Sequence, residues 1–98
     1  GPEGRLGPAE AAAKAGLIGR TKWAARDYGD QGVRVNAIAP GPVLTSAVMH
    51  GYDSGTASYP IPRMGTPEDM AETVAFLCSP VSGYITGEVI KVAGGVGM

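Results

Sequence analysis

The chain has 98 residues, of which 44% are hydrophobic and 17% are charged, with a formal net charge of −1. These values are typical of one small globular domain, and the lack of a basic balance excludes the charge pattern that binds nucleic acid or anionic membranes. No apolar stretch approaches the about 20 residues that span a bilayer, and no signal-peptide pattern opens the sequence. We therefore expect a cytoplasmic protein with neither a nucleic-acid nor a membrane partner.

The first predicted element is a helix over residues 9–28. Its apolar residues recur at the spacing of one helix face, which carries Leu17, Ile18, Thr21, Ala24, Ala25 and Tyr28. The amino-terminal half consists mostly of alanine and glycine, so it has little side-chain bulk. Alanine simply favours a helix, whereas Gly16 and Gly19 each cost about 0.5–1 kcal/mol in a helix interior. We expect another backbone or a cofactor to pack closely on this surface.

A short parallel strand is predicted next, over residues 33–39, where β-branched and small residues dominate. Proline lacks a backbone N–H, so we expect the strand to stop at Pro40. Gly41 follows and lets a backbone come close to whatever lies at the carboxyl end of the strand. In open α/β sheets, ligands bind at that end. Asn36, in the middle of the strand, is interpreted as structural, with its side chain hydrogen-bonded to a neighbouring loop.

Residues 46–63 show no sustained period and predict a long loop with at most a short helical turn, a feature typical of binding loops. Thr66 then predicts a helix start, with Pro67 at the first helical position and two carboxylates in the first turn. The helix is expected to end at Cys78. Its predicted buried stripe consists of Met70, Thr73, Val74 and Leu77. A second short strand is predicted over residues 88–92.

Two single residues exclude other kinds of site. Cys78 is the one cysteine, which excludes an internal disulfide and a cysteine-based zinc cluster. Because its neighbours on the predicted helix are apolar, we expect a buried thiol. His50 is the one histidine, so a histidine-based metal site or a Ser-His-Asp triad would need unusual substitutes. We predict no metal site.

The order of elements is helix, strand, long loop, helix, strand, which predicts the α/β class. Two parallel strands joined by a crossover need further strands and helices, and a two-stranded sheet is marginal alone. We expect an irregular segment at residues 1–8 and one unit at residues 9–98 that is part of a larger sheet, or an oligomer that completes it. The glycines of residues 94–97 are not a dinucleotide fingerprint, which must open a helix.

Several runs of residues together resemble a known family. They are Ala12-Ala13-Lys14-Ala15-Gly16, the stretch from Gly32 to Val43 with Thr45, Arg63-Met64-Gly65-Thr66-Pro67-Glu68-Asp69, Tyr84-Ile85-Thr86-Gly87, and Gly94-Gly95. In one register they resemble the carboxyl-terminal portion of the short-chain dehydrogenase/reductases, most closely the 3-oxoacyl-carrier-protein reductase and glucose dehydrogenase type. The resemblance implies part of a Rossmann-type, doubly wound parallel sheet that is incomplete as a stand-alone domain. It also implies hydride transfer between NAD or NADP and a small carbonyl or alcohol substrate.

The resemblance also implies roles for single residues. Lys14 matches the lysine that binds the nicotinamide ribose and lowers the pKa of a catalytic tyrosine one helical turn earlier. Pro40 and Gly41 match the proline and glycine beside the nicotinamide, Val43 the residue whose backbone holds the carboxamide, and Thr45 a hydroxyl near that amide. A solvated helix lysine at Lys14 and a loop cap at Thr45 remain alternatives. The helix over residues 9–28 and the last helix and strand match subunit interfaces of a homo-oligomer, and the loop after Thr45 matches the substrate loop.

The sequence departs from the family at the position of the catalytic tyrosine, where it has Glu10. A carboxyl is far more acidic than a phenol, so Glu10 beside Lys14 stays ionised and would form an ion pair one turn apart rather than donate a proton. The family's phosphate loop and catalytic serine would precede Gly1. We therefore expect this chain alone to be inactive and to hold a dinucleotide incompletely. The alternative is a non-catalytic oligomerisation module derived from the family.

Overall fold

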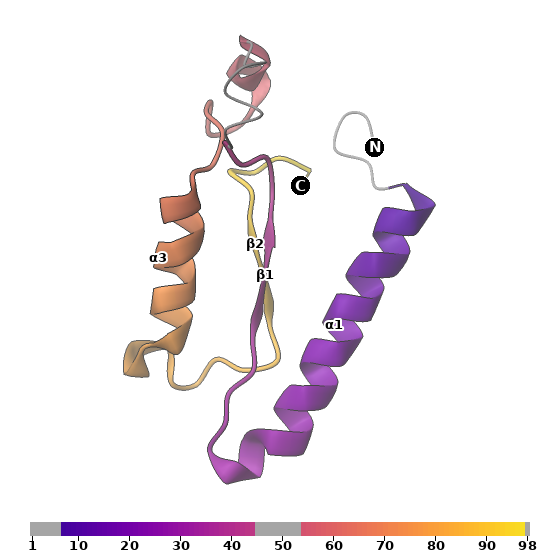
Figure 1. Cartoon of the computed structure of the whole chain (residues 1–98), viewed down its shortest axis with the longest axis vertical. Coiled ribbons are helices and arrows are strands. Elements are labelled where there is room, and N and C mark those ends of the chain that lie inside the picture. The colour runs from indigo at the N-terminus through magenta and orange to yellow at the C-terminus, as the bar shows by residue number, and fades with distance from the viewer. Residues whose placement is uncertain (1–6, 45–53, 98) are drawn as a thin grey trace.

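The computed structural model describes residues 7–44 and 54–97 of the chain. Its helices and strands are α1 (Pro8–Tyr28), β1 (Ala37–Pro40), α3 (Pro67–Cys78) and β2 (Val89–Val92), and short 3-10 turns lie at Gly29–Gln31, Ser54–Ser58 and Pro80–Ser82. The two strands pair in parallel, and α1 and α3 lie on opposite faces of this small sheet (Figure 1). The predicted α/β class and order of elements are confirmed.

The pairing of β1 with β2 explains why Pro40 belongs to the strand. The Ala37 N–H donates to the Glu88 carbonyl at 2.9 Å, and the Gly41 N–H donates to the Val92 carbonyl at 3.0 Å. Backbone groups alternate along a strand, so the nitrogen of Pro40 lies on the edge of β1 that faces away from β2. The missing N–H therefore costs the ladder nothing, and the strand stops at Pro40 as predicted, with Pro40 rather than Ala39 as its last residue.

The predicted start of the first strand is wrong, because residues 33–36 lie beside a turn rather than beside β2. The side-chain amide of Asn36 donates to the Ile85 carbonyl at 3.0 Å, and its oxygen accepts the Glu88 N–H at 3.1 Å. β2 begins only at Val89, so residues 33–36 have no strand to pair with. The structural role predicted for Asn36 is confirmed.

Helix α1 is covered only in its carboxyl-terminal half. Thr21 and Ala25 are buried, whereas every residue from 8 to 17 is exposed. A Cβ atom added at Gly16 or Gly19 would meet nothing within 4 Å. The close packing predicted for these two glycines is therefore not found among the described residues. The short turn Gly29–Gln31 that follows α1 ends at Gly32, which has the left-handed conformation with φ of 78°.

Helix α3 begins and ends where the sequence predicts, because its signals are local. The Thr66 hydroxyl accepts the Asp69 N–H at 3.1 Å, and the Asp69 carboxylate accepts the Thr66 N–H at 2.8 Å. These two bonds form a capping box, which satisfies two backbone donors at the start of the helix. The helix ends at Cys78, as predicted.

The buried stripe predicted for α3 is only partly confirmed, because a sheet of two strands is narrower than that stripe. Leu77 is buried, whereas 44% of Val74 is exposed and Cys78 is exposed. The prediction of a buried thiol is thus wrong. Val74 and Cys78 line an open hollow of about 410 Å³ beside β1, with Ile38 on its other side.

The chain exposes more surface than a closed domain of its size. Its accessible surface is 6930 Å², whereas a compact folded chain of this mass exposes about 5,200 Å². The radius of gyration is 15.4 Å, against about 12.6 Å for a compact domain of this length. Ala25 and Leu77 are the buried apolar residues of the described part, and 7% and 9% of their surfaces stay exposed. The fold is accordingly part of a domain. Among the described residues, no helix has the length and apolar character needed to cross a membrane.

Candidate functional site

The candidate site lies where both strands end, at the top of Figure 1, which is also the end at which α1 begins. Gly41 directly follows β1 and lies against Ala93, which follows β2. A Cβ atom at Gly41 would lie 2.5 Å from the Cβ and 2.8 Å from the Cα of Ala93. The close approach predicted at Gly41 is therefore present, and Ala93 is the residue that makes it.

Val43 has the backbone geometry that a cofactor amide requires. It forms an isolated parallel bridge with Gly65, in which the Gly65 N–H donates to the Pro42 carbonyl at 2.8 Å and the Leu44 N–H donates to the Gly65 carbonyl at 2.7 Å. These bonds use the neighbours of Val43, so its own N–H and C=O point to the side opposite Gly65. Within the described ranges no residue is hydrogen-bonded to them. One donor beside one acceptor fits a primary amide group.

Lys14 lies on the side of the sheet that α1 covers. It is exposed, and it lines a hollow of about 240 Å³ together with Ala39 of β1 and Lys91 of β2. Ala39 precedes the Pro40–Gly41 pair, so the structure brings Lys14 to the carboxyl half of β1. Glu10 lies one turn earlier on the same helix face. Thr45 lies outside the described residues.

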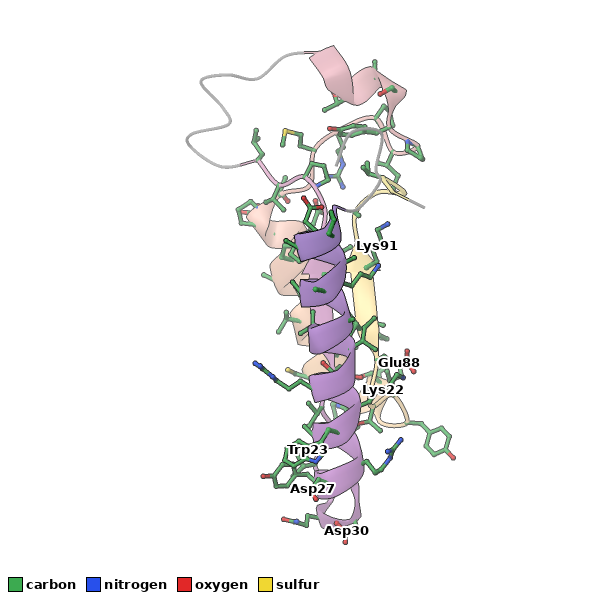
Figure 2. All side chains as sticks on the ribbon, turned by 90° about the vertical axis from the view of Figure 1, so that its right-hand side faces the viewer. Lys22, Trp23, Asp27, Asp30, Glu88 and Lys91 are labelled. Atoms are coloured by element: carbon green, nitrogen blue, oxygen red, sulfur yellow. The ribbon has the colours of Figure 1, made fainter. Side chains whose placement is uncertain are left out.

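Two further lysines lie near Lys14, and the sequence analysis did not single them out. Lys22 donates to the Gly87 carbonyl at 3.5 Å, and Lys91 donates to the Gly97 carbonyl at 2.6 Å. Figure 2 shows Lys22 and Lys91 on the same side of the molecule as Glu88. These residues come together only because α1 packs against the strands, so no local sequence pattern could have found them.

The segment before α3 is held by an ion pair that sequence reasoning missed. Arg63 contacts the Asp69 carboxylate with both guanidinium nitrogens, at 2.7 and 3.2 Å. One of these nitrogens also donates to the Met64 carbonyl at 3.0 Å. The hydrogen bond from Arg63, together with the Thr66 N–H, lowers the pKa of Asp69 to about 2. The run from Arg63 to Asp69 was interpreted from sequence only as a helix start and as part of a resemblance.

This lowered pKa predicts how stability changes with pH. The ordinary pKa of an aspartate is about 3.9. Because the folded value is lower, Asp69 contributes its full stabilisation above about pH 4 and loses it as the pH falls through about 2. Urea unfolding at pH 7, 5, 3 and 2 should show the advantage of the wild type over Asp69→Asn shrinking only below pH 4. A constant difference down to pH 2 would contradict this.

A second hollow, of about 430 Å³, lies between α3, the end of β2 and the segment after Ser54–Ser58. Its lining is mainly apolar and includes Ile61, Met70, Phe76 and Val92. Its volume lies within the range of small-molecule sites. Gly94 and Gly95, with φ of 58° and 86°, turn the chain at its edge, and Gly94 accepts the Ile61 N–H at 3.0 Å. The tail glycines thus form a turn.

Comparison with known proteins places this geometry in a family. A family model described as enoyl-(acyl carrier protein) reductase matches residues 5–97. The chain is 44% identical to the (3R)-3-hydroxyacyl-CoA dehydrogenase of Mus musculus, covering 100% of the chain and 40% of that protein. It is 46% identical to the 3-oxoacyl-[acyl-carrier-protein] reductase of Vibrio cholerae, covering 100% of the chain and 42% of that protein. The chain belongs to the short-chain dehydrogenase/reductase family.

Solved structures of short-chain dehydrogenase/reductases agree with this assignment. A 3-oxoacyl-[acyl-carrier protein] reductase from Brucella melitensis superposes with a TM-score of 0.80 at 36% identity, over 91% of the chain and 35% of that protein. A blue fluorescent protein from a metagenomic library, in complex with NADPH, superposes with a TM-score of 0.81 at 35% identity, over 99% of the chain and 41% of that protein. The chain thus spans about 40% of the length of its relatives, and the predicted family and partial Rossmann-type fold are confirmed. This family consists of NAD(P)-dependent oxidoreductases.

Proposed function

We propose that this chain forms the nicotinamide-facing, carboxyl-terminal part of an oxidoreductase that transfers a hydride between NAD(H) or NADP(H) and a small carbonyl or alcohol. The observation that carries this proposal is the backbone of Val43, whose N–H and C=O point away from Gly65 at the carboxyl ends of the strands. Through them Val43 accepts the amide hydrogen and donates to the amide oxygen of the nicotinamide carboxamide. When bound, the nicotinamide supplies or accepts the hydride.

The other site residues have supporting roles in this proposal. Lys14 binds the hydroxyls of the nicotinamide ribose, since it lies on the face of α1 turned toward β1 and β2. Gly41 leaves the position after β1 without a side chain, and Pro40 before it has no backbone N–H, so that the nicotinamide ring can approach the backbone at Gly41. Thr45 lies outside the described residues, and its part in cofactor binding is proposed from the resemblance alone. Glu10 occupies the position of the proton donor, and as a carboxylate it does not protonate an alkoxide.

The relatives suggest a substrate class. The names of two of them refer to 3-hydroxyacyl-CoA and to 3-oxoacyl-[acyl-carrier-protein]. Both compounds are thioesters with an oxygen function on the third carbon of an acyl chain. We extend this class to the present chain as its carbonyl or alcohol substrate.

The partner that we propose is a second copy of the chain. The exposed residues 8–17 of α1 and the accessible surface of 6930 Å² support it. The excess over a compact chain is about 1,700 Å², about twice the roughly 800 Å² that each partner buries in a standard interface. Contact through α1 and through α3 with β2 would cover it. The same surfaces support the second candidate function, an oligomerisation module without catalysis.

Titration of the chain with NADPH and NADH, followed by nicotinamide fluorescence and calorimetry, tests this function. Sedimentation of the same samples gives the oligomeric state. Saturable binding of either cofactor by a defined oligomer supports the nicotinamide-facing role. An oligomer that binds neither cofactor would contradict that role and favour the oligomerisation module.

A further inference from the structure

The loop that follows β1 is closed by a neck, which we define as Pro42, Val43, Leu44 and Gly65. The loop begins after Leu44 and ends at Gly65, where the two backbone bonds of 2.7 and 2.8 Å join its ends outside the sheet. A Cβ atom at Gly65 would lie 3.3 Å from the Pro42 carbonyl oxygen, so the two segments are in close contact. The position of Gly65 therefore sets the direction in which the Val43 backbone points.

Gly65 is held in turn from both sides by one carboxylate. Asp69 receives the guanidinium of Arg63, two residues before Gly65, and the N–H of Thr66, one residue after it. Arg63 also donates to the Met64 carbonyl at 3.0 Å. The backbone from Arg63 to Thr66 is therefore held at both of its ends. Asp69 lies in the first turn of α3, so the neck is tied to a rigid element.

We propose that Arg63 is a positioning residue for the nicotinamide site: by clamping the segment before α3 to Asp69, it holds Gly65 so that the Val43 N–H and C=O stay aimed at the cofactor. The last step of this inference rests on the proposed function, whereas the clamp rests on the contacts alone. Bidentate pairs between arginine and a carboxylate fix direction as well as distance, which suits this task.

Because the Arg63–Asp69 pair is partly exposed, its positioning role can be distinguished from a contribution to global stability. The side chains of Arg63 and Asp69 are 55% and 29% exposed, and ion pairs at such positions add little to global stability. The Thr66 hydroxyl caps α3 without Arg63, since it accepts the Asp69 N–H. Loss of the Arg63 side chain should therefore loosen the neck and leave the start of α3 capped.

Amide hydrogen exchange tests the clamp, with Arg63→Gln as the variant and Thr66→Ala as its matched control. The control removes the helix-capping hydroxyl but keeps the Arg63–Asp69 pair. The amides of Leu44 and Gly65 report on the neck, and those of Ala37 and Gly41 report on the sheet. We expect Arg63→Gln to raise the amide exchange rates of the neck at least about tenfold relative to those of the sheet. A change of this size corresponds to the loss of one charge-assisted hydrogen bond.

Thr66→Ala should leave the ratio of amide exchange at the neck to amide exchange at the sheet unchanged. Equal acceleration in both variants, or none in Arg63→Gln, would overturn the clamp.

The affinity for NADPH tests the positioning step. We expect Arg63→Gln to weaken binding about tenfold, and Arg63→Lys, which keeps a single charged contact, to recover part of the loss. Unchanged affinity with a loosened neck would overturn the positioning role. If the wild-type chain binds no NADPH, the proposed function fails and the positioning role fails with it, while the exchange ratio still decides whether Arg63 clamps the neck.

Discussion

Replacing Gly41 with alanine should separate the carboxyl ends of β1 and β2 and abolish cofactor binding. The new Cβ atom would lie 2.5 Å from the Cβ and 2.8 Å from the Cα of Ala93, and the second atom belongs to the backbone. No side-chain rotation relieves such a contact, so the strand ends must move apart. Forced overpacking of this kind lowers the free energy of unfolding by roughly 1–3 kcal/mol. Urea unfolding and NADPH titration measure the two effects.

Two further variants show whether the contact is the cause. Gly41→Ala combined with Ala93→Gly removes the 2.5 Å contact but keeps the 2.8 Å one, so it should recover part of the lost stability. Gly16→Ala is the matched control, because its added Cβ meets nothing within 4 Å. In a monomer it should stabilise α1 by about 0.5–1 kcal/mol. Equal changes in the free energy of unfolding for Gly41→Ala and Gly16→Ala would contradict the role of the contact between Gly41 and Ala93.

Restoring a tyrosine at position 10 should raise the catalytic rate by roughly 100- to 10,000-fold, the usual range of general acid–base catalysis. The comparison needs a complete enzyme, for example residues 9–97 joined to the amino-terminal part of the Vibrio cholerae 3-oxoacyl-[acyl-carrier-protein] reductase. Glu10 lies one helical turn before Lys14 in α1, so a phenol there would reach the ammonium group. A phenol beside an ammonium donates a proton to an alkoxide, whereas a carboxylate does not.

The control for Glu10→Tyr is Glu10→Gln, which removes the charge without adding a proton donor. Its kcat should stay close to that of the Glu10 protein. If the Glu10 protein turns over as fast as Glu10→Tyr, then another group supplies the proton and the role assigned to position 10 is wrong. If Glu10→Gln gains as much as Glu10→Tyr, the negative charge of Glu10 was the obstacle.

The elements that the sequence predicts best carry their signals locally. Helix α3 was placed correctly from Thr66, Pro67 and the carboxylates of its first turn, which cap it by themselves. The predicted start of β1 was wrong, because it depends on where β2 begins. The burial of Cys78 was wrong for a similar reason, since it depends on what covers α3.

The support of the candidate site could not be predicted from the sequence. The strand signal pointed to Pro40, which ends β1, and to Gly41, which follows it, whereas Val43 was singled out by the family resemblance. What turns the backbone of Val43 outward is its bridge to Gly65, and what holds Gly65 is Arg63. Both are distant from Val43 in sequence, and no periodic pattern links them. Such pairings appear only in the folded chain.

Recognition of the nicotinamide carboxamide by Val43 is tested by comparing NADPH with its analogue that carries a carboxylate in place of the carboxamide. We predict that the chain binds NADPH and binds the acid at least about tenfold more weakly, a loss of about 1.4 kcal/mol. The reason is that a carboxylate cannot donate to the Val43 carbonyl. Equal affinity for both compounds, or tighter binding of the acid, would contradict recognition of the amide by Val43.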